Sequence, residues 1–306
     1  MNIKKIKKGI KKPSLLVFHS CVRLSKLIPS DQLYLKILYR ASVGKKLDFA
    51  HPVTFTQKIQ WLKLHNTSDL CTLLVDKYNV REWIKSKIGE EYLIPCYGIW
   101  NHFDNIDFTQ IPNQFVLKTT HDSGSVVICK NKENFDYKSA KKKLEKSLKR
   151  NYFWKGREYP YKNVPPRIIA EKYMENEDGT DIVDYKFFCF NGEPKVMFYA
   201  SERFNAQNEP PKFDYYDMNL NHMPIQSCGH DNLNTLSYFP EFEIMKQLAA
   251  ELSKGFPHIR VDFYLIDGKI FFGEMTFHHD GGFVSFIPEE WDKTFGDMID
   301  LTNYPV

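Results

Sequence analysis

RVDFYLIDGKIFFGEMT, residues 260–276, is the most informative stretch of this chain. Two runs rich in Phe, Tyr, Ile and Val flank the pair Asp267-Gly268, which is a strong signal for a β-hairpin. Arg260, Asp262 and Glu274 interrupt positions that a hairpin buried in a core would leave apolar. Carboxylate oxygens are ligands that Mg²⁺ prefers, and a guanidinium can clamp a phosphoryl group. The hairpin is therefore a candidate metal and phosphate site.

The length of the hairpin loop determines whether these groups meet, because side chains alternate between the two faces of a strand. A two-residue loop would put the carboxylates of Asp262 and Glu274 on opposite faces. A three-residue loop over 266–268 gathers them with Arg260 and Thr276 on one face. We predict the three-residue loop, since a type I turn with a glycine bulge is common. A half-exposed hairpin with structural ion pairs remains the alternative.

The composition is that of a globular chain with more than one subdomain. Its 306 residues are 42% hydrophobic and 26% charged, which suffices for two or three subdomains around shared cores. A net charge of +4 is too balanced to indicate a nucleic-acid partner, and no nucleic-acid-binding motif is present. The six cysteines form no C-x-x-C pair, so we expect reduced thiols and a cytoplasmic location.

The N-terminal segment is basic and amphipathic. Residues 1–12 hold six lysines, and apolar residues from Val17 to Ile28 then follow helical spacing. A second helix is predicted over 31–41. Such a segment can lie on an anionic membrane surface, but a helix packed on its own domain explains the pattern equally well. The chain contains no apolar run of the ~18 residues that a membrane span needs.

Local patterns predict alternating helices and strands in the rest of the chain. Thr54 and Gln57 form a capping box, and Asp76 is a second candidate cap. Residues 151–166 read as a loop, and residues 204–240 have no periodicity that we can assign. The predicted helices cover about 54–65, 77–89, 137–150 and 242–254. Residues 92–97 are predicted as a strand or the entry to one, and further strands are predicted over 115–118, 126–129, 167–173, 184–191 and 194–202.

A phosphate cradle is predicted after the strand that ends at Lys118. The loop that follows contains Ser123, Gly124 and Ser125, whose amides and hydroxyls can donate to phosphate oxygens beside the ammonium. The loop is not a Walker P-loop, because G-x-x-x-x-G-K-[ST] is absent. An ordinary hairpin is the alternative interpretation.

Further charged groups are candidates for the same site. Lys77 opens a predicted helix, Asp184 and Lys186 share one face of a strand, and Arg203 closes the next strand. Glu171 ends an apolar strand, where its carboxylate can accept from a ribose hydroxyl. For each of them a salt bridge at the rim of the fold is the alternative role.

Several other activities are disfavoured by missing motifs. His278 and His279 lack a second pair of zinc ligands at a recognisable spacing, so we interpret them as polar loop groups near the site. The chain has no G-x-S-x-G, H-E-x-x-H or G-x-G-x-x-G. Hydrolase and dinucleotide-binding functions therefore have little support.

The order of these features resembles the ATP-grasp superfamily. More specifically, the chain is similar to the TupA-like branch, which is associated with teichuronopeptide and other surface-polysaccharide biosynthesis. The resemblance covers about residues 45–300. It is carried by six segments: 54–62, 76–81, 115–118, 169–173, 184–192 and 272–277.

The resemblance implies an α+β fold in which two subdomains grip ATP, preceded by an N-terminal helical segment. The expected boundaries are 1–45 for the basic segment, 46–110 for an N-terminal subdomain, 111–172 for a small lid subdomain and 173–306 for the subdomain with the metal site. The cofactors that it implies are ATP and Mg²⁺.

The resemblance also implies roles for individual residues. Asp262 and Glu274 would hold Mg²⁺, with Thr276 as a third candidate ligand at a position where many ATP-grasp enzymes have Asn. Arg260, Lys186 and Arg203 would act on the transferred phosphoryl group. The residues expected to bind the nucleotide are Lys77, Lys118, Ser123, Gly124, Ser125, Glu171, Lys172, Tyr173, Met174 and Asp184.

The implied reaction is ATP-dependent ligation of a carboxylate to an amine through an acyl phosphate. The implied partners are a glycan or small-molecule carboxylate, such as a uronic acid of a surface polysaccharide or its precursor, and an amine. No nucleic acid is expected. The alternatives are an ATP-grasp sugar kinase, a sugar-nucleotide-dependent glycosyltransferase and an inactive scaffold of a polysaccharide assembly complex. Peripheral contact with the cytoplasmic membrane face also remains open.

Overall fold

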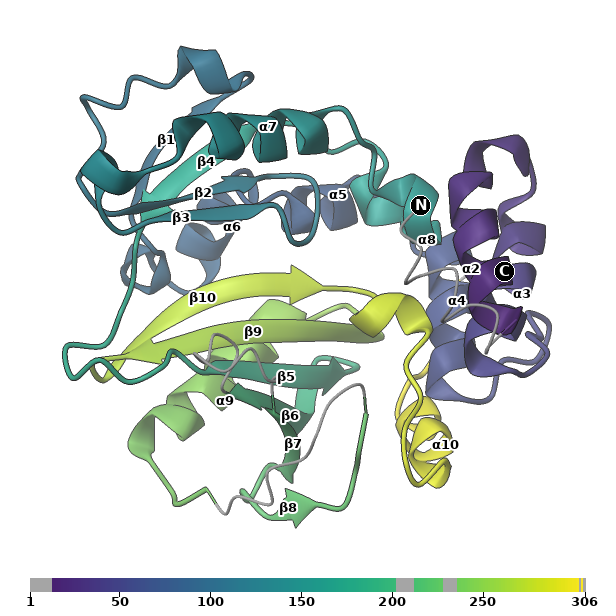
Figure 1. Cartoon of the computed structure of the whole chain (residues 1–306). Coiled ribbons are helices and arrows are strands. Elements are labelled where there is room, and N and C mark those ends of the chain that lie inside the picture. The colour runs from purple at the N-terminus through teal and green to yellow at the C-terminus, as the bar shows by residue number, and fades with distance from the viewer. Residues whose placement is uncertain (1–12, 202–211, 228–235, 303, 305–306) are drawn as a thin grey trace.

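The computed structural model describes residues 13–201, 212–227, 236–302 and 304. Two antiparallel sheets lie one above the other, and a group of helices stands at one end of both (Figure 1). The α+β fold expected from the sequence is therefore confirmed. Within the described residues, none of the helices is long and apolar enough to cross a membrane.

The smaller sheet has four strands with α7 (Tyr137–Leu148) packed on one face. The core between them contains Phe115, Leu117, Leu144 and Ile168. β1 comes from the range expected to form the N-terminal subdomain, yet it pairs with β4 and completes this sheet. The strand order is β1 (Cys96–Trp100), β4 (Ile168–Lys172), β2 (Phe115–Thr119) and β3 (Val126–Cys129).

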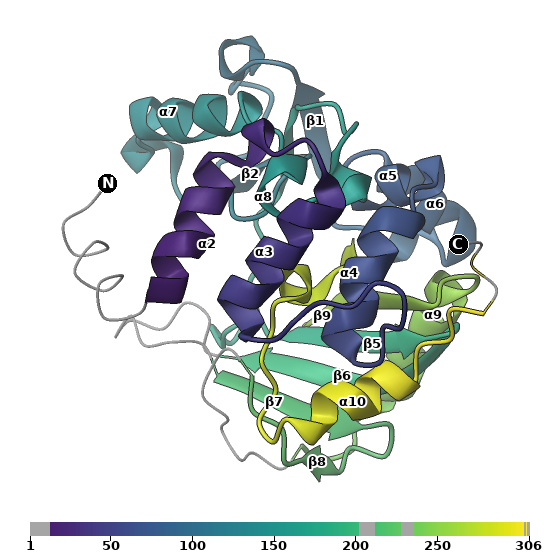
Figure 2. The same ribbon diagram turned by 90° about the vertical axis from the view of Figure 1, so that its right-hand side faces the viewer.

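The larger sheet has six strands, and both of its faces are covered. One face packs on α9 (Pro240–Ser253) through Phe187, Val261 and neighbouring apolar residues. The opposite face packs through Phe188 and Phe198 beneath α4 (Phe55–His65) and α10 (Glu290–Asp297), as Figure 2 shows. The strand order is β10 (Lys269–Thr276), β9 (His258–Ile266), β5 (Asp184–Phe190), β6 (Glu193–Ser201), β7 (Lys212–Asp217) and β8 (His222–Met223).

The helix α4 begins where the sequence predicts. Thr54 accepts from the amide of Gln57, and the Gln57 side chain accepts from the Thr54 amide, so the predicted capping box is confirmed. The amide and hydroxyl of Thr56 both donate to Asp292 of α10 at 2.8 Å. These contacts anchor α4 against the C-terminal helix. Two short helices follow it, α5 (Asp69–Val75) and α6 (Val80–Lys87).

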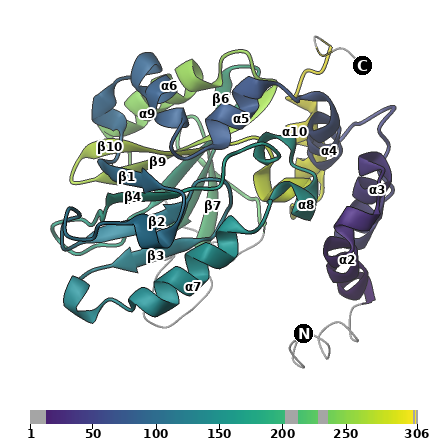
Figure 3. The ribbon, with the colours of Figure 1, turned by 90° about the horizontal axis from the view of Figure 1, so that it is seen from above.

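The N-terminal helices α2 (Pro13–Arg23) and α3 (Asp31–Val43) stand beside the sheets (Figure 3). Their main polar link to the body is Arg157, which follows α8 (Phe153–Gly156) and is only 1% exposed. Its guanidinium lies 2.7 Å from the Asp31 carboxylate and 4.5 Å from the ring centres of Tyr34 and Trp154. These helices therefore pack on their own chain, as one of the two interpretations expected.

One prediction of local structure was wrong, one predicted strand entry leads to a strand that starts late in its range, and one region that was left unassigned contains strands. Residues 92–97, predicted as a strand or the entry to one, lead from a 3-10 turn (Glu90–Tyr92) into β1, which begins at Cys96. The predicted loop over 151–166 contains α8 and a 3-10 turn (Tyr159–Tyr161). The unassigned region 204–240 contributes β7, which pairs with β6, and the two-residue edge strand β8 beside it.

Candidate active site

The hairpin loop has two residues, not three. Lys269 pairs directly with Ile266, which leaves Asp267 and Gly268 in the turn. Both have positive φ, +50° and +71°, as a type I′ turn requires. The predicted three-residue loop was therefore wrong, because Asp-Gly satisfies the tighter turn that matches the twist of the strands.

The extra residue lies instead in β10, as a β-bulge at Gly273. Phe272 pairs with Phe263, but Glu274 pairs with Asp262, so Gly273 has no partner of its own. A Cβ atom on Gly273 would lie 3.0 Å from the carbonyl oxygen of Asp262, and the bulge therefore favours a residue without a side chain. One extra residue shifts the alternation of faces, whether it stands in the loop or in the strand. The predicted convergence of Asp262 and Glu274 on one face is confirmed.

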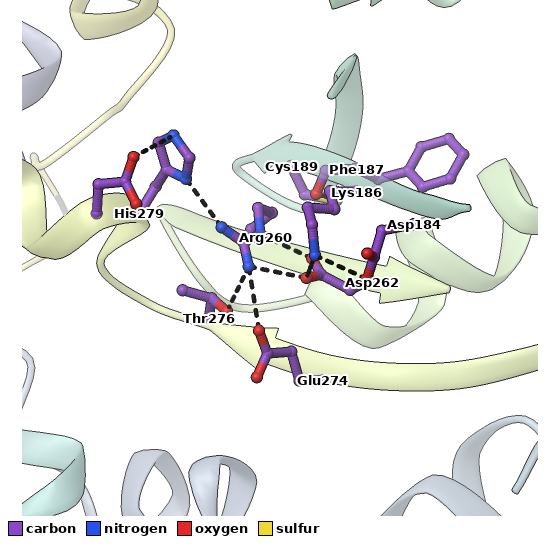
Figure 4. Close-up of polar contacts among 10 residues, drawn as sticks. Asp184, Lys186, Phe187, Cys189, Arg260, Asp262, Glu274, Thr276 and His279 are labelled. Atoms are coloured by element: carbon purple, nitrogen blue, oxygen red, sulfur yellow. Dashed lines mark hydrogen bonds and ion pairs between the residues drawn. The ribbon is translucent and has the colours of Figure 1, made fainter. Parts of the chain in front are cut away.

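Arg260 is the centre of the charged cluster on that face (Figure 4). Its Nε and Nη2 donate to the two carboxylate oxygens of Asp262 at 2.7 and 2.8 Å. Nη2 also lies 3.2 Å from Glu274 Oε1 and 3.1 Å from Thr276 Oγ1. Burial works against the charged guanidinium, but the attraction of Asp262 and Glu274 outweighs it and raises the pKa of Arg260.

The neighbouring strand adds a second cation. Lys186 on β5 is directly opposite Asp262. Its Nζ donates to Asp262 Oδ2 at 2.6 Å and to Asp184 Oδ1 at 3.0 Å. Burial alone would raise the pKa of Asp262, yet Arg260 and Lys186 together lower it. The buried Asp262 carboxylate is therefore ionised, and the predicted sharing of one face by Asp184 and Lys186 is confirmed.

Lys77 lies in the turn between α5 and α6, since α6 begins at Val80 and not directly after Asp76 as predicted. Its Nζ donates to the carbonyl oxygen of Asp122 at 2.5 Å, in the loop between β2 and β3. Burial lowers the pKa of the Lys77 ammonium, while the negative charges of Glu274 and Asp122 oppose this effect. The Lys77 ammonium is thus close enough to interact electrostatically with Glu274 of the hairpin, and it is hydrogen-bonded to the β2–β3 loop of the smaller sheet.

The smaller sheet presents a second lysine. Lys118 on β2 pairs with Glu171 on β4, at 2.7 Å between Nζ and Oε2. Arg81 of α6 lies 3.5 Å from the other carboxylate oxygen of Glu171, a contact that the sequence analysis missed. After Glu171, Lys172 is exposed, whereas Tyr173 and Met174 are partly buried. These groups line the end of β4 where the resemblance places the nucleotide base.

The loop between β2 and β3 is organised around Asp122. Its carboxylate accepts from the hydroxyls of Thr119, Ser125 and Ser147, each at 2.5 Å. Gly124 has a φ of +90°, which suits glycine. The Ser125 hydroxyl therefore stabilises the loop itself, and the donors left for a phosphate are mainly backbone amides. Arg203 lies outside the described residues, so the structure does not place it.

His279 contacts Arg260, a role that the sequence analysis did not predict for it. Its Nδ1 lies 2.8 Å from Nη1 of Arg260 (Figure 4). In the sequence, the adjacent His278 and His279 after β10 indicated polar groups near the site, but not which of the two would face it. His278 instead lies 3.5 Å from Glu158.

A comparison with protein families finds one whose model, TupA-like ATP-grasp, matches residues 57–300. The chain belongs to this family. The ATP-grasp fold is typical of ATP-dependent carboxylate–amine ligases. The membership covers both sheets and every site residue described above, and it confirms the resemblance drawn from the sequence.

Solved structures of ATP-grasp proteins resemble the chain only distantly. D-alanine–D-alanine ligase from Bacillus anthracis with ATP is 13% identical, with 67% of this chain and 53% of that chain covered and a TM-score of 0.38. The ATP-grasp ligase PsnB, with its minimal precursor, Mg and ADP, is 9% identical, with coverage of 80% and 62% and a TM-score of 0.38. A RimK-domain ATP-grasp protein from Sphaerobacter thermophilus is 9% identical, with coverage of 77% and 70% and a TM-score of 0.42.

The chain spans about half the length of the first solved proteins that it matches, 53%, 57% and 50%. No curated protein sequence matches the chain.

The donor set of this TupA-like protein fits Mg²⁺ that arrives with a nucleotide. Asp262 and Glu274 are cross-strand partners, and the Thr276 hydroxyl lies beside them around Arg260. The described residues contain no cluster of three or more His, Cys, Asp or Glu side chains that would hold a metal alone. Mg²⁺ commonly binds through one or two carboxylates together with substrate phosphates and water. Two carboxylates, one of them half-exposed at Glu274, satisfy that requirement.

Proposed function

We propose that the protein is an ATP- and Mg²⁺-dependent ligase that joins a carboxylate to an amine. The observation that carries the proposal is the convergence of Arg260, Asp262 and Glu274 on one face of the C-terminal hairpin, with Lys186 beside them. Lys77 adds a cation from outside the six-stranded sheet, within electrostatic reach of Glu274. Membership of the ATP-grasp family supports ATP as the phosphoryl donor.

The residues divide into a nucleotide-binding and a phosphoryl-binding group. We assign the phosphates of ATP to Lys77 and Lys118 and the base and ribose to residues 171–174. Asp262 and Glu274 would hold Mg²⁺, with Thr276 as a further oxygen ligand, and Arg260 would contact the transferred phosphoryl group. Bound Mg²⁺ supplies positive charge that offsets the charge of the phosphates, and the fixed cations of the chain add to this stabilisation.

The reaction that follows has two steps. An oxygen of the substrate carboxylate attacks the γ-phosphorus of ATP, which gives an acyl phosphate and ADP. The amine then attacks the acyl carbon, phosphate leaves, and an amide forms. Arg260 and Lys186 would stabilise negative charge on the transferring group, which is where most of the catalysis of phosphoryl transfer lies.

The proposed substrate class rests on the family resemblance. The resemblance to the TupA-like branch favours a surface polysaccharide or its sugar precursor as the carboxylate, for example a uronic acid, and a cytoplasmic location. We place the nucleotide between a lid subdomain, residues 111–172 together with β1, and a C-terminal subdomain, residues 173–306. The rest of residues 46–110 forms the proposed N-terminal subdomain. Lysines on one side and the acidic hairpin on the other support this arrangement.

The products of the reaction test the proposal. Purified protein is incubated with ATP, Mg²⁺, candidate uronic acids and amines, and nucleotides and products are identified by mass. ADP together with an amide supports ligation. ADP with a phosphorylated sugar would establish a kinase instead, and release of UDP from a sugar nucleotide would establish a glycosyltransferase. Either outcome would overturn the ligase proposal.

Glu274→Gln tests the metal site directly. Removal of one preorganised charge is expected to lower the turnover rate ~10²–10³-fold. Glu243→Gln on α9 is the matched control, because both side chains are 46% exposed and Glu243 pairs only with Lys246 in the described residues. Full activity in Glu274→Gln would show that Glu274 holds no metal. A thermal melt of both variants separates a lost ligand from a lost fold.

The N-terminal helices favour a second property, peripheral binding to an anionic membrane surface. Leu24, Leu27 and Leu33 surround the turn between α2 and α3 and are half-exposed or more, with Leu27 at 75%. Six lysines precede α2 in the sequence. Exposed apolar side chains combined with basic residues are typical of helices that lie at a membrane interface.

A further inference from the structure

We propose that His279 is a positioning residue that orients the guanidinium of Arg260, and that α4 holds His279 in place. The inference rests on the proposed role of Arg260 in phosphoryl transfer. Nη1 of Arg260 lies 2.8 Å from Nδ1 of His279. A guanidinium can only donate, so Nδ1 must be the acceptor and the ring proton must be on Nε2, 3.6 Å from the carboxylate of Asp280.

The environment of His279 keeps the imidazole neutral. The residue is 2% exposed, and its ring packs edge-on against Phe188 and Phe198 at centroid distances of 4.8 and 5.5 Å. Burial, together with the charge of Arg260, lowers the pKa of His279 to about 4, although Asp280 opposes this effect. A neutral acceptor fixes the direction of the guanidinium without adding a third negative charge to those of Asp262 and Glu274.

The hydrogen bonds of Arg260 leave one donor for a ligand. Nε and Nη2 are taken by Asp262, Glu274 and Thr276, and one hydrogen of Nη1 is taken by His279. Among the described residues, the second hydrogen of Nη1 has no acceptor. Asp262 sets the plane of the guanidinium from one side, and His279 holds the end that carries the remaining donor. That donor is the one we assign to the transferring phosphoryl group.

The loop after His279 is held by two buried side chains of α4. Residues 280–282 all have positive φ, from +47° to +68°. The carbonyl oxygen of Gly281 accepts from Lys63 at 2.6 Å and from Gln60 at 3.0 Å, and that of Gly282 accepts from Gln60 at 2.8 Å. A Cβ atom on Gly282 would lie only 2.5 Å from Gln60 Nε2, so the loop is fitted closely against α4. A helix from the other end of the chain thus determines where His279 stands.

The tautomer of His279 is the first test, and it needs no substrate. Nitrogen-15 NMR of the full-length protein with labelled histidine, assigned by comparison with His279→Asn, reports which ring nitrogen carries the proton near neutral pH. We expect a neutral ring with the proton on Nε2 and an acceptor Nδ1. A proton on Nδ1, or a doubly protonated ring, would overturn the proposal whether or not the ligase activity is found.

The second test separates positioning from folding. His279→Leu removes the acceptor, whereas His279→Asn keeps an oxygen close to the place of Nδ1. We expect His279→Leu to lower kcat for ADP formation roughly 10–100-fold, as for a misplaced catalytic group, with KM for ATP changed less than about twofold. His279→Asn should recover most of kcat. The control is His258→Phe, which should keep kcat. His258 is a buried histidine of β9, and its Nδ1 donates to the Cys189 carbonyl oxygen at 3.0 Å, the one hydrogen bond of its ring within the described residues.

Each outcome has a distinct meaning. Equal kcat in the wild type and His279→Leu, or no difference between the Leu and Asn variants, would refute the positioning role. If His279→Leu does not fold, the comparison of His279→Asn with the wild type and the tautomer measurement decide. If the wild type forms no ADP with any acceptor, the proposed function fails, and the tautomer still tests the contact between His279 and Arg260.

Discussion

At the scale of single residues, the site depends on a glycine that performs no chemistry. Gly273 is the unpaired residue of the bulge in β10, and its position turns Glu274 toward Asp262. Before the bulge, Ile270 and Phe272 enter the core, and after it Met275 and Phe277 do. The core residues thus change from even to odd positions at Gly273, and Glu274 and Thr276 therefore lie on the polar face.

A side chain at Gly273 should therefore damage both stability and activity. Gly273→Val places methyl groups against the Asp262 carbonyl and the Tyr264 ring, which a Cβ atom would already approach to 3.0 and 3.3 Å. We expect a loss of about 1–3 kcal/mol in the free energy of unfolding, as for other overpacked sites, and loss of turnover. Urea titration and the ADP assay measure the two effects. Gly268→Asn, in the open turn, should keep both, and a fully active Gly273→Val would show that the bulge is dispensable.

At the scale of elements, β9 carries both the site and a histidine buried beneath α4. His258 packs between Phe55 and Phe190 at centroid distances of 5.0 and 4.9 Å and contacts the Cys189 carbonyl through Nδ1. Burial lowers the pKa of His258 to about 3. The contact between α4 and the six-stranded sheet therefore requires a neutral imidazole.

This requirement predicts a dependence of stability on pH. Below its ordinary pKa of about 6.5 the unfolded chain protonates His258, but the folded chain does not until about pH 3. The contribution of neutral His258 to the free energy of unfolding is thus complete above pH 6.5 and is lost as the pH falls toward 3. Between pH 7 and pH 5 the loss from this residue is about 2 kcal/mol.

His258→Phe should remove this component. Urea denaturation near pH 7 and pH 5 should show a difference in unfolding free energy that is smaller than that of the wild type by about 2 kcal/mol. The exposed His102→Asn is the control and should leave the difference unchanged. An unaltered difference in His258→Phe would mean that other groups cause the sensitivity to acid.

At the scale of the whole molecule, the N-terminal helices pack on the body through the buried side of α3 and leave other apolar side chains uncovered. Arg157 is buried at the junction, between Tyr34 and Trp154, and donates to the carbonyl oxygens of Ser25 and Ile28. Leu27, between those two residues in the chain, is exposed. The attachment holds the pair of helices at one side of both sheets (Figure 3).

Binding to vesicles tests this arrangement. Sedimentation with vesicles of roughly 30% phosphatidylserine should exceed sedimentation with neutral vesicles and should weaken with salt. Replacement of Leu24, Leu27 and Leu33 by Ser should remove most of the sedimentation with anionic vesicles. Replacement of Leu70 and Leu73, exposed on α5, is the control. Equal binding to neutral and anionic vesicles, or none, would refute the membrane contact.

Most of the site was predictable because its chemistry is carried by short segments. The apolar runs around Asp267-Gly268 identified the hairpin, and the acids within it identified the polar face. The position of the extra residue was not identified, since one residue added in the loop or in the strand gives the same parity. The change in apolar spacing from Ile270 and Phe272 to Met275 and Phe277 was the signal that would have located the bulge.

The sequence alone thus determined the family, the two carboxylates and the arginine beside them, because alternation along a strand is a local property. Only the tertiary structure brought β1 beside β4, and Lys77 beside the loop at Asp122. It also brought His279 to Arg260, where Gln60 and Lys63 hold the following loop by hydrogen bonds. These contacts join parts of the chain that are far apart and have no common period. Their geometry is set by how two sheets and a helix pack, which no local pattern encodes.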